Sequence, residues 1–294
     1  MTILDPKTTR RRLLARTAST YSKAAYLPNE IADRLFEHLL PIKLEPQFIL
    51  DLGAKTGHSS ALLRQRYPNA QIISLEMTVP LLQQIKTGWR WWRKTTRICA
   101  DYEKLPFLTG QIDAVFANLS LLWCDDLSLL LQEIRRVLRP EGLFLFSSLG
   151  PDSLREIRQS WAQVDTMPHV HSLVDMHDIG DQLLQAQFLD PVMEMEYLTL
   201  EYQSTNVLFQ DLKALGWQNI AADRRKTLTG KQRLATFLQQ YSTFQQADGV
   251  FPTTLEIIYG HAWAPSVGHA IRTADGEIRI SVESLQVNFR KQAK

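Results

Sequence analysis

The chain has 294 residues, of which 45% are apolar and 22% charged, and its formal net charge is +2. These proportions are those of ordinary globular proteins, so they exclude a disordered or fibrous chain, and the small net charge disfavours a protein that wraps nucleic acid. The length fits one large α/β domain with insertions or two modest domains.

Short apolar runs alternate with longer amphipathic runs from residue 29 to about residue 150, which is typical of βα units in a mostly parallel sheet. The apolar, β-rich runs that end at turn residues predict strands at 48–52, 71–76, 96–100, 113–118 and 143–149. Apolar residues at three- and four-residue spacing predict helices packed on this sheet at 58–67, 80–89 and 127–138. The segment 139–144, "RPEGLF", predicts the end of the last helix and the return to a strand.

The pattern loosens after residue 150. It predicts strands at 192–202 and 255–263, with helical stretches around 209–217 and 231–241. Residues 201–250 are therefore interpreted as an insertion between two late strands. We expect four segments, which are an N-terminal helical segment or lid (1–44), a ligand-binding core (45–150), a second half of the sheet with the helical insertion (151–264), and a polar tail (265–294) with a possible hairpin at 275–281.

The segment "ILDLGAKTG", residues 49–57, predicts a strand that runs into a ligand-binding turn. In an open parallel sheet, ligands bind beyond the carboxyl ends of the strands, and the first turn is part of that crevice. Gly53 and Gly57 would let the backbone approach a ligand closely, Thr56 adds a hydroxyl, and Asp51 places a carboxylate at the strand's exit.

Two further acidic residues lie at the ends of the next two strands. Glu76 ends the second strand, where it can accept hydrogen bonds from both hydroxyls of a ribose. Asp101 follows the third strand, where it can accept a hydrogen bond from an adenine amino group. Each alone is more often a turn or cap residue, but together they favour an adenosine ligand with a positive charge. A phosphate ligand is the weaker interpretation, because Ser59 or no residue takes the place of the third glycine of a GxGxxG turn.

Residues 45–150 resemble the class I S-adenosylmethionine-dependent methyltransferases. The resemblance is carried by "ILDLGAKTG", Glu76, "ADYEKLPF" (100–107), "DAVFANLSLLWCDD" (113–126) and "LRPEGLFLFSSLGPD" (138–152). It implies an α/β, Rossmann-like fold with a seven-stranded, mostly parallel sheet and helices on both faces. It also implies S-adenosyl-L-methionine as the cofactor. The implied cofactor-binding residues are Asp51, Gly53, Thr56, Gly57, Glu76, Met77, Asp101, Tyr102 and Asn118.

A narrower resemblance covers most of the chain. Blocks such as "DMHDIGD" (175–181) and "YGHAW" (259–263) are similar to the malonyl-acyl-carrier-protein O-methyltransferases of biotin synthesis. This implies methyl transfer to the free carboxylate of a malonyl thioester, on malonyl-acyl carrier protein or malonyl-CoA. Mitochondrial complex I assembly factors with an arginine hydroxylase role share the first block and are the main alternative. The sequence offers no clear two-histidine, one-carboxylate iron site to support them.

Lys55 departs from the family turn, which usually runs glycine, any residue, glycine, threonine, glycine. A long charged side chain could force a different φ or enter the methionine half of the cofactor site. It could also turn outward, or meet the cofactor's carboxylate. A working cofactor site is the favoured interpretation, and a catalytically degenerate paralogue or assembly factor stays open.

Methyl transfer to a carboxylate needs no general base, because a carboxylic acid with a pKa of about 4 is ionised at neutral pH. It needs positioning and a cationic clamp, for which arginine is suited. Arg158 is the first candidate, with Arg155 on the same helical face, although exposed helix arginines are common. Tyr21 lies on an N-terminal segment that could close over the pocket, and a plain core or surface tyrosine is the alternative.

Three histidines, His169, His171 and His177, invite a metal-site interpretation. Their apolar neighbours favour a substrate wall or structural histidines instead, so we predict no metal. Asp175 or Asp178 is expected to cap the helix that follows. Trp123 could line the cofactor pocket or pack between helix and sheet.

Two basic clusters, Arg10–Arg12 and Arg90–Lys94, are candidate docking surfaces for a strongly acidic acyl carrier protein. Solvated basic faces and cation–π contacts within one helix are the alternatives. Neither nucleic acid nor a membrane is expected as a partner, and the oligomeric state is left open.

The expected location is the cytoplasm. No apolar run approaches the roughly 18 residues of a membrane span, and the N-terminus lacks the apolar core of a secretory signal. Cys99 and Cys124 lack CxxC spacing, which favours a reducing compartment. The Arg-rich, acid-poor start leaves an organelle transit peptide as a minor alternative.

Overall fold

The computed structural model describes residues 6–86, 96–221, 224, 225, 227–266, 271, 272, 278 and 279. Its centre is a seven-stranded sheet with the strand order β3-β2-β1-β4-β5-β7-β6. The strands are β1 (Phe48–Leu52), β2 (Gln71–Glu76), β3 (Thr96–Cys99), β4 (Ile112–Ala117), β5 (Leu138–Leu149), β6 (Leu189–Tyr202) and β7 (Phe251–Trp263). Strands β1 to β5 pair in parallel, whereas β7 runs antiparallel to both β5 and β6. The predicted seven-stranded, mostly parallel sheet is confirmed.

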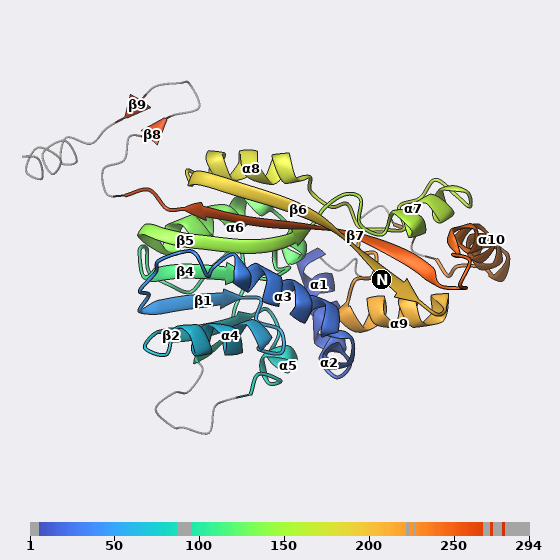
Figure 1. Ribbon diagram of the computed structural model, residues 1–294, viewed down its shortest axis with the longest axis horizontal. Coiled ribbons are helices and arrows are strands. Elements are labelled where there is room, and N and C mark those ends of the chain that lie inside the picture. Colours follow the sequence, from blue (N-terminus) through green and yellow to red (C-terminus); the bar gives the residue numbers. More distant parts are fainter. Residues whose placement is uncertain are drawn as a thin grey trace, which may run out of the picture.

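Helices cover both faces of this sheet (Figure 1). From β1 to β2 and on to β3 the chain adds strands on one side of β1. From β4 to β5 it adds strands on the other side. Because such crossovers are right-handed, the helices α4 and α6 that make them lie on opposite faces. The helices are α1 (Pro6–Thr17), α2 (Tyr21–Ala24), α3 (Tyr26–Glu37), α4 (His58–Arg66), α5 (Val79–Leu82), η2 (Leu121–Trp123), α6 (Leu127–Val137), α7 (Arg155–Ala162), α8 (Met176–Gln185), α9 (Thr205–Leu215), α10 (Lys231–Tyr241) and η3 (Ser242–Phe244).

The burial of the strands explains why their apolar runs could be predicted from the sequence. All six residues of β4 and four of the five in β1 are buried, as expected for strands covered on both faces. β6 lies at the edge of the sheet, and its residues mostly alternate between half-buried and exposed. The core is therefore centred on β1, β4 and β5.

Several predicted boundaries differ from the structure, among them the following three. The helix predicted at 80–89 ends at Leu82, and residues 87–95 lie outside the described part of the chain. β5 already begins at Leu138, and the predicted turn at 139–142 is an irregularity within it, with Glu141 at φ +61°. Pro140 cannot donate to a strand ladder, so pairing is interrupted there rather than ended. β6 begins at Leu189, three residues early, with a register shift before Val192.

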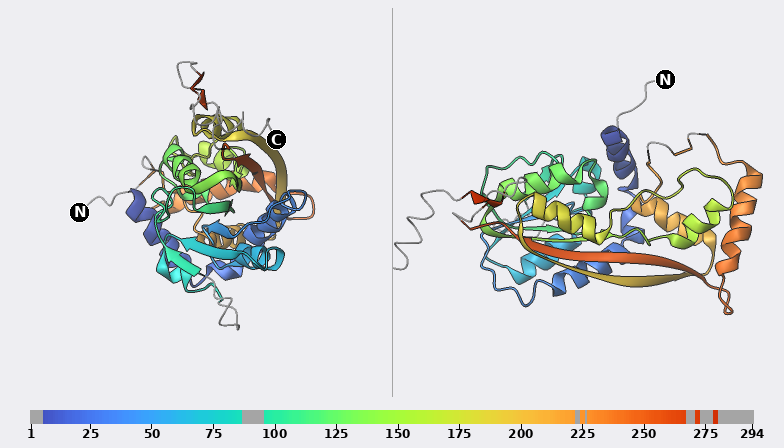
Figure 2. Two further views of the ribbon diagram at one scale, coloured as in Figure 1. Left: turned by 90° about the vertical axis from the view of Figure 1, so that its left-hand side faces the viewer. Right: turned by 90° about the horizontal axis from the view of Figure 1, so that it is seen from above.

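The N-terminal helices and the insertion gather beyond the carboxyl ends of the parallel strands (Figures 1 and 2). α1 and α2 contact α9, and α10 packs against α7. α9 and α10 both lie between β6 and β7 in the chain. These helices enclose the edge of the sheet at which ligands bind in open α/β folds.

Two short strands, β8 (Ile271–Arg272) and β9 (Ile278–Arg279), form an antiparallel pair. This pair shares residues 278 and 279 with the predicted hairpin at 275–281. Among the described residues, no helix is both long and apolar enough to cross a lipid bilayer.

Candidate active site

The turn after β1 depends on glycine at two positions. Gly53 has φ +76° and Gly57 has φ +88°, which is the left-handed region that glycine adopts at little cost. A Cβ on Gly53 would lie 2.2 Å from Ser120 Oγ, and one on Gly57 would lie 2.8 Å from Ile85 Cγ2. Residues after β1, β4 and β2 therefore approach one another closely at this edge, and α4 begins directly after Gly57.

Lys55 lies in the left-handed backbone region that favours glycine. Its φ is +47°, and the residue is only 7% exposed. The side chain points into the site rather than outward. Its Nζ lies 3.3 Å from Glu76 Oε2 and 3.5 Å from the Tyr102 hydroxyl. The same ammonium lies 5.1 Å from the centroid of the Trp123 ring, within cation–π range.

Glu76 is fully buried and accepts four hydrogen bonds from the described residues. Its Oε1 accepts from the Met77 N–H at 2.8 Å and from the Tyr102 hydroxyl at 3.0 Å. Its Oε2 accepts from the backbone N–H of Lys55 at 3.1 Å and from Lys55 Nζ. Burial and the negative charge of Glu76 raise the pKa of Tyr102 well above its ordinary value. The tyrosine therefore stays protonated and donates to the carboxylate.

Asp51 supports the turn from within the sheet. The Ser60 hydroxyl in α4 donates to its carboxylate, and Ser60 also contacts the Ser74 hydroxyl at 2.6 Å. Burial raises the pKa of Asp51 to about 7, although the hydrogen bond from Ser60 acts in the opposite direction. Thr56 lies half-buried in the same turn.

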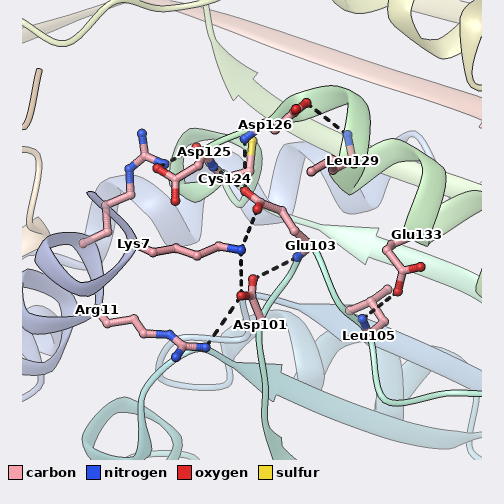
Figure 3. A network of polar contacts seen from close by, with 11 residues as sticks. Lys7, Arg11, Asp101, Glu103, Leu105, Cys124, Asp125, Asp126, Leu129 and Glu133 are labelled. Carbon is pink, nitrogen blue, oxygen red and sulfur yellow. Dashed lines mark hydrogen bonds and ion pairs between the residues drawn. The ribbon is translucent and has the colours of Figure 1, made fainter. Parts of the chain in front are cut away.

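Asp101 is held by the N-terminal helix (Figure 3). Lys7 Nζ in α1 lies 2.8 Å from Asp101 Oδ2 and 2.7 Å from Glu103 Oε2, and an Arg11 nitrogen lies 3.9 Å from Asp101 Oδ2. Burial raises the pKa of Asp101, but hydrogen bonds from Lys7 and from the Glu103 N–H give a net lowering. Sequence reasoning missed this clamp, for which the basic start of the chain was the only indication.

Asn118 and Tyr21 flank the site on other sides. Asn118 Nδ2 donates to the Pro28 carbonyl at 2.8 Å, and its Oδ1 accepts from the Ser147 hydroxyl at 2.7 Å. The side chain thus ties β4 to α3 and β5. Tyr21 is buried at the start of α2, and its pKa is raised by burial and then by the charge of Glu76. The structure therefore brings Tyr21, Tyr102 and Glu76 together.

An apolar pocket of about 340 Å³ is lined by Trp123, whose ring centroid also lies 5.1 Å from Lys55 Nζ. It is enclosed by η2, α7, the link before α8, α9 and the residues after α9, and its walls include Trp123, Trp161, His171, Leu212 and Trp217. Trp123 is 5% exposed. It contacts the Lys55 ammonium of the glycine turn and lines the apolar pocket, so the turn and the pocket adjoin at this residue.

Two of the three histidines line the apolar pocket, and the third is exposed. His169 lines the pocket, stacks on Trp161 with ring centroids 3.8 Å apart, and contacts Asp165 at 2.8 Å. His171 also lines the pocket, and its buried Nδ1 has no hydrogen-bond partner among the described residues. Burial lowers the pKa of His171, and the charge of Arg10 adds to this.

His177 is exposed at the other end of this link. Asp175 Oδ1 accepts from the His177 N–H at 2.8 Å. Of the two caps predicted for α8, Asp175 and Asp178, the structure therefore has Asp175. Within the part of the chain that the structure describes, no three metal-ligating side chains gather.

Neither of the two predicted arginine clamps is among the residues that line the pocket. Arg158 donates to the carbonyls of Pro151 and Ser153, and Arg155 Nε lies 3.4 Å from Glu156 Oε1. α7 contributes apolar side chains, among them Ile157, to the pocket instead. Spacing on a helix places residues on one face but does not tell which face meets the cavity, so this orientation was beyond the sequence.

Part of the predicted basic cluster at 10–12 is used inside the molecule. Arg10 donates to the Cys124 carbonyl and to the Asp125 carboxylate, and Arg11 lies near Asp101. Arg12 is exposed. The second cluster, Arg90–Lys94, lies outside the described residues.

A second hollow, of about 540 Å³, lies between α1, α2 and α9. The side chains that line it include the three basic residues Arg16, Lys23 and Lys213, together with Asp211. Lys213 and Gln218 line both this basic groove and the apolar pocket, so the two hollows adjoin. Only the folded insertion brings these residues together, which is why sequence reasoning missed them.

Comparison with known proteins decides the family. Residues 50–146 match the family described as "Methyltransferase domain". The malonyl-[acyl-carrier protein] O-methyltransferase of Gallionella capsiferriformans is 43% identical over 270 residues, which cover 90% of this chain and 92% of that protein. Malonyl-[acyl-carrier protein] O-methyltransferase 1 of Coxiella burnetii is 40% identical over 91% of each chain. The chain belongs to the malonyl-[acyl-carrier protein] O-methyltransferase family.

Solved structures agree on the fold of this family member. The YcgJ protein of Bacillus subtilis has a TM-score of 0.57 at 14% identity, covering 79% of this chain and 98% of that one. A putative methyltransferase of Bacillus halodurans has a TM-score of 0.55 at 13% identity, covering 80% and 99%. The predicted class I methyltransferase fold is confirmed, as is S-adenosylmethionine at the level of the family.

The residues of this site fit an adenosyl group, provided that one of the present hydrogen-bond donors to Glu76 leaves. The glycine turn gives close backbone approach, and Glu76 is the buried carboxylate that ribose hydroxyls require. Glu76, however, already accepts four hydrogen bonds, which is about the full capacity of a carboxylate. A ribose can bind there only when one present donor leaves.

Proposed function

We propose that the protein transfers a methyl group from S-adenosylmethionine to the free carboxylate of malonyl-acyl carrier protein, a step in the synthesis of the biotin precursor. Support comes from near full-length relatives at about 40% identity that are named for this reaction. The carrying observation is Trp123, because one side chain both lies 5.1 Å from the Lys55 ammonium of the cofactor turn and lines the apolar pocket, so the proposed donor and acceptor sites adjoin.

On the cofactor side, Gly53 and Gly57 would receive the methionine and ribose parts, and Glu76 would accept from the ribose hydroxyls. Asp101, with Tyr102 beside it, would border the adenine. We propose supporting roles for the remaining predicted residues, which are Asp51, Thr56, Met77 and Asn118. When bound, S-adenosylmethionine supplies an electrophilic methyl group on a sulfonium. The buried Tyr21 and Trp123 would keep water away from that methyl.

On the substrate side, the chain must position a carboxylate that is already ionised, so no proton acceptor is assigned. The apolar pocket suits an acyl thioester. His171 is our preferred positioning residue, because its unpartnered Nδ1 is buried in a wall of the pocket. An unpartnered buried polar atom is costly unless a ligand satisfies it. Arg158 stays a weaker candidate, because its donors already serve two backbone carbonyls.

The basic groove of Arg16, Lys23 and Lys213 is our proposed docking surface for the acidic carrier protein. It opens beside the apolar pocket, so a thioester arm that follows Lys213 would lead from the carrier to the pocket. Malonyl-CoA is the alternative substrate. We place this reaction in the cytoplasm, which the two free cysteines support.

The activity is tested by mixing the purified protein with methyl-labelled S-adenosylmethionine and either malonyl- or acetyl-acyl carrier protein. We expect base-labile label on the malonyl carrier alone, because only malonate offers a free carboxylate. An unlabelled malonyl carrier at saturating cofactor would contradict the proposal.

The docking surface is tested by the double variant Arg16→Glu, Lys23→Glu. We expect a rise in KM for malonyl-acyl carrier protein of about tenfold, with little change for malonyl-CoA, because rim charges steer an acidic partner. Lys43→Glu is the matched control, since Lys43 is exposed in the link before β1, at the opposite edge of the sheet. Equal effects of the double variant on both substrates would contradict docking at this groove.

A catalytically silent member of the fold is the second candidate. The observation that favours it is the Lys55 ammonium beside Glu76, because it takes up an acceptor position that a ribose needs. Failure of methyl transfer together with failure to bind S-adenosylhomocysteine would support this candidate.

A further inference from the structure

Glu76 has no acceptor position to spare in this structure. A carboxylate offers about four lone-pair positions, and four donors lie within 3.3 Å of its two oxygens. Ribose hydroxyls bind as donors to such a carboxylate. Binding of an adenosyl group is therefore an exchange, in which ribose hydroxyls replace a donor that the protein itself supplies.

Only one of the four donors can leave without moving the fold. Two are backbone N–H groups, of Met77 at the end of β2 and of Lys55 in the glycine turn. The third is the hydroxyl of Tyr102, whose ring is 1% exposed. The fourth is the Lys55 ammonium, which ends a flexible four-carbon stem and makes the longest of the four contacts, at 3.3 Å.

We propose that the Lys55 ammonium is a displaceable internal cation, which occupies the ribose-binding side of Glu76 in the empty protein and must leave before an adenosyl ligand can bind. Its role is to keep the buried carboxylate paired while the site is empty. The inference concerns the cofactor site alone, so it does not depend on the identity of the methyl acceptor.

Two consequences follow from this exchange, with opposite signs. A protein whose open state is populated only part of the time binds its ligand more weakly by that fraction, so removal of the ammonium strengthens adenosyl binding. Removal also leaves a buried carboxylate without its cationic partner, which destabilises the empty protein. The ligand-free protein therefore becomes less stable while its complex becomes tighter.

The test is calorimetric titration of the full chain and of Lys55→Met with adenosine and, separately, with S-adenosylhomocysteine. Loss of one charge-assisted hydrogen bond corresponds to about a tenfold effect. We expect Kd to fall about tenfold for both ligands in Lys55→Met, because both carry the ribose. Lys43→Met, which removes an exposed lysine at the other edge of the sheet, is the matched control and should leave both Kd values unchanged.

The two ligands separate this mechanism from a direct contact with the cofactor. If Lys55 instead pairs with the carboxylate of the amino-acid part, Lys55→Met weakens S-adenosylhomocysteine binding and leaves adenosine binding unchanged. That result overturns the proposal, and so does an unchanged Kd for both ligands.

Two more variants keep the test decisive if Lys55→Met folds poorly. Lys55→Gly restores the glycine that suits the positive φ of this position and should also bind both ligands more tightly. Lys55→Arg keeps the cation and should bind with Kd values close to those of the native chain. Thermal unfolding should show a lower Tm for ligand-free Lys55→Met and a larger rise on adding S-adenosylhomocysteine. Equal Tm values and equal rises would contradict the proposed pairing.

Discussion

At the scale of single residues, Asp51 links the site to pH. Burial raises its pKa to about 7 from an ordinary value of 3.8. Between these two pH values the folded protein keeps a proton on Asp51 that the unfolded chain loses. The stability that this proton gives is fully present below about pH 4 and is lost as pH rises through about 7.

Asp51→Asn should therefore flatten the dependence of unfolding free energy on pH between about 4 and 7. At pH 8 the variant should be more stable than the native chain by a few kcal/mol, because one pKa unit corresponds to about 1.4 kcal/mol. Denaturant unfolding at pH 5 and pH 8 measures this, with the exposed Asp181→Asn as control. A variant that is less stable at pH 8 would show that Asp51 is ionised without penalty.

Substitution of His171 is the most direct test of the proposed substrate-positioning role. His171→Phe keeps the aromatic bulk and removes the unpartnered Nδ1. We expect kcat/KM for the malonyl substrate to fall about tenfold or more, which is the effect of one hydrogen bond to a charged group, while the Kd for S-adenosylhomocysteine stays the same. His177→Phe, at an exposed site, should change neither value. A purely structural His171 would leave kcat/KM intact.

At the scale of elements, the end of α9 shapes the apolar pocket. Gly216 has φ +78° at the end of this helix, and a Cβ there would lie 3.1 Å from Trp123 Cη2 and 3.2 Å from Thr17 Cγ2. The glycine therefore lets α9, η2 and α1 approach one another.

Gly216→Ala should lower the unfolding free energy by about 1–2 kcal/mol, because alanine is strained in the left-handed region. Gly180→Ala is the matched control, since Gly180 lies inside α8 and a Cβ there meets nothing within 4 Å. That change should stabilise the protein by about 0.5–1 kcal/mol. Denaturant unfolding compares the two. Equal changes in both variants would mean that the end of α9 places no special demand on Gly216.

At the scale of the whole molecule, the sheet was predictable because β1 and β4 are buried on both faces and read as continuous apolar runs. The positions of Glu76 and Asp101 at the sheet edge could be predicted, because Glu76 ends β2 and Asp101 lies two residues after β3. The contact of Asp101 with Lys7 could not be predicted, because Lys7 reaches it only after α1 has folded back over the sheet. Helix ends were least certain, as the early end of the helix predicted at 80–89 illustrates.

The apolar pocket and the basic groove exist only in the folded molecule. Their walls come from η2, α7, α9 and the N-terminal helices, which are far apart in the chain. No local sequence pattern predicts that these distant segments come into contact. The same holds for Lys55, whose departure from the family turn was evident but whose direction depends on the pocket that surrounds it.

The most direct test of this account is a crystal structure of the full chain with S-adenosylhomocysteine bound. We predict that both ribose hydroxyls donate to Glu76, that the sulfur lies on the Lys55 side of Trp123, and that Lys55 Nζ has left Glu76. A ligand bound elsewhere, or a ribose bound with the Lys55–Glu76 contact intact, would contradict the account.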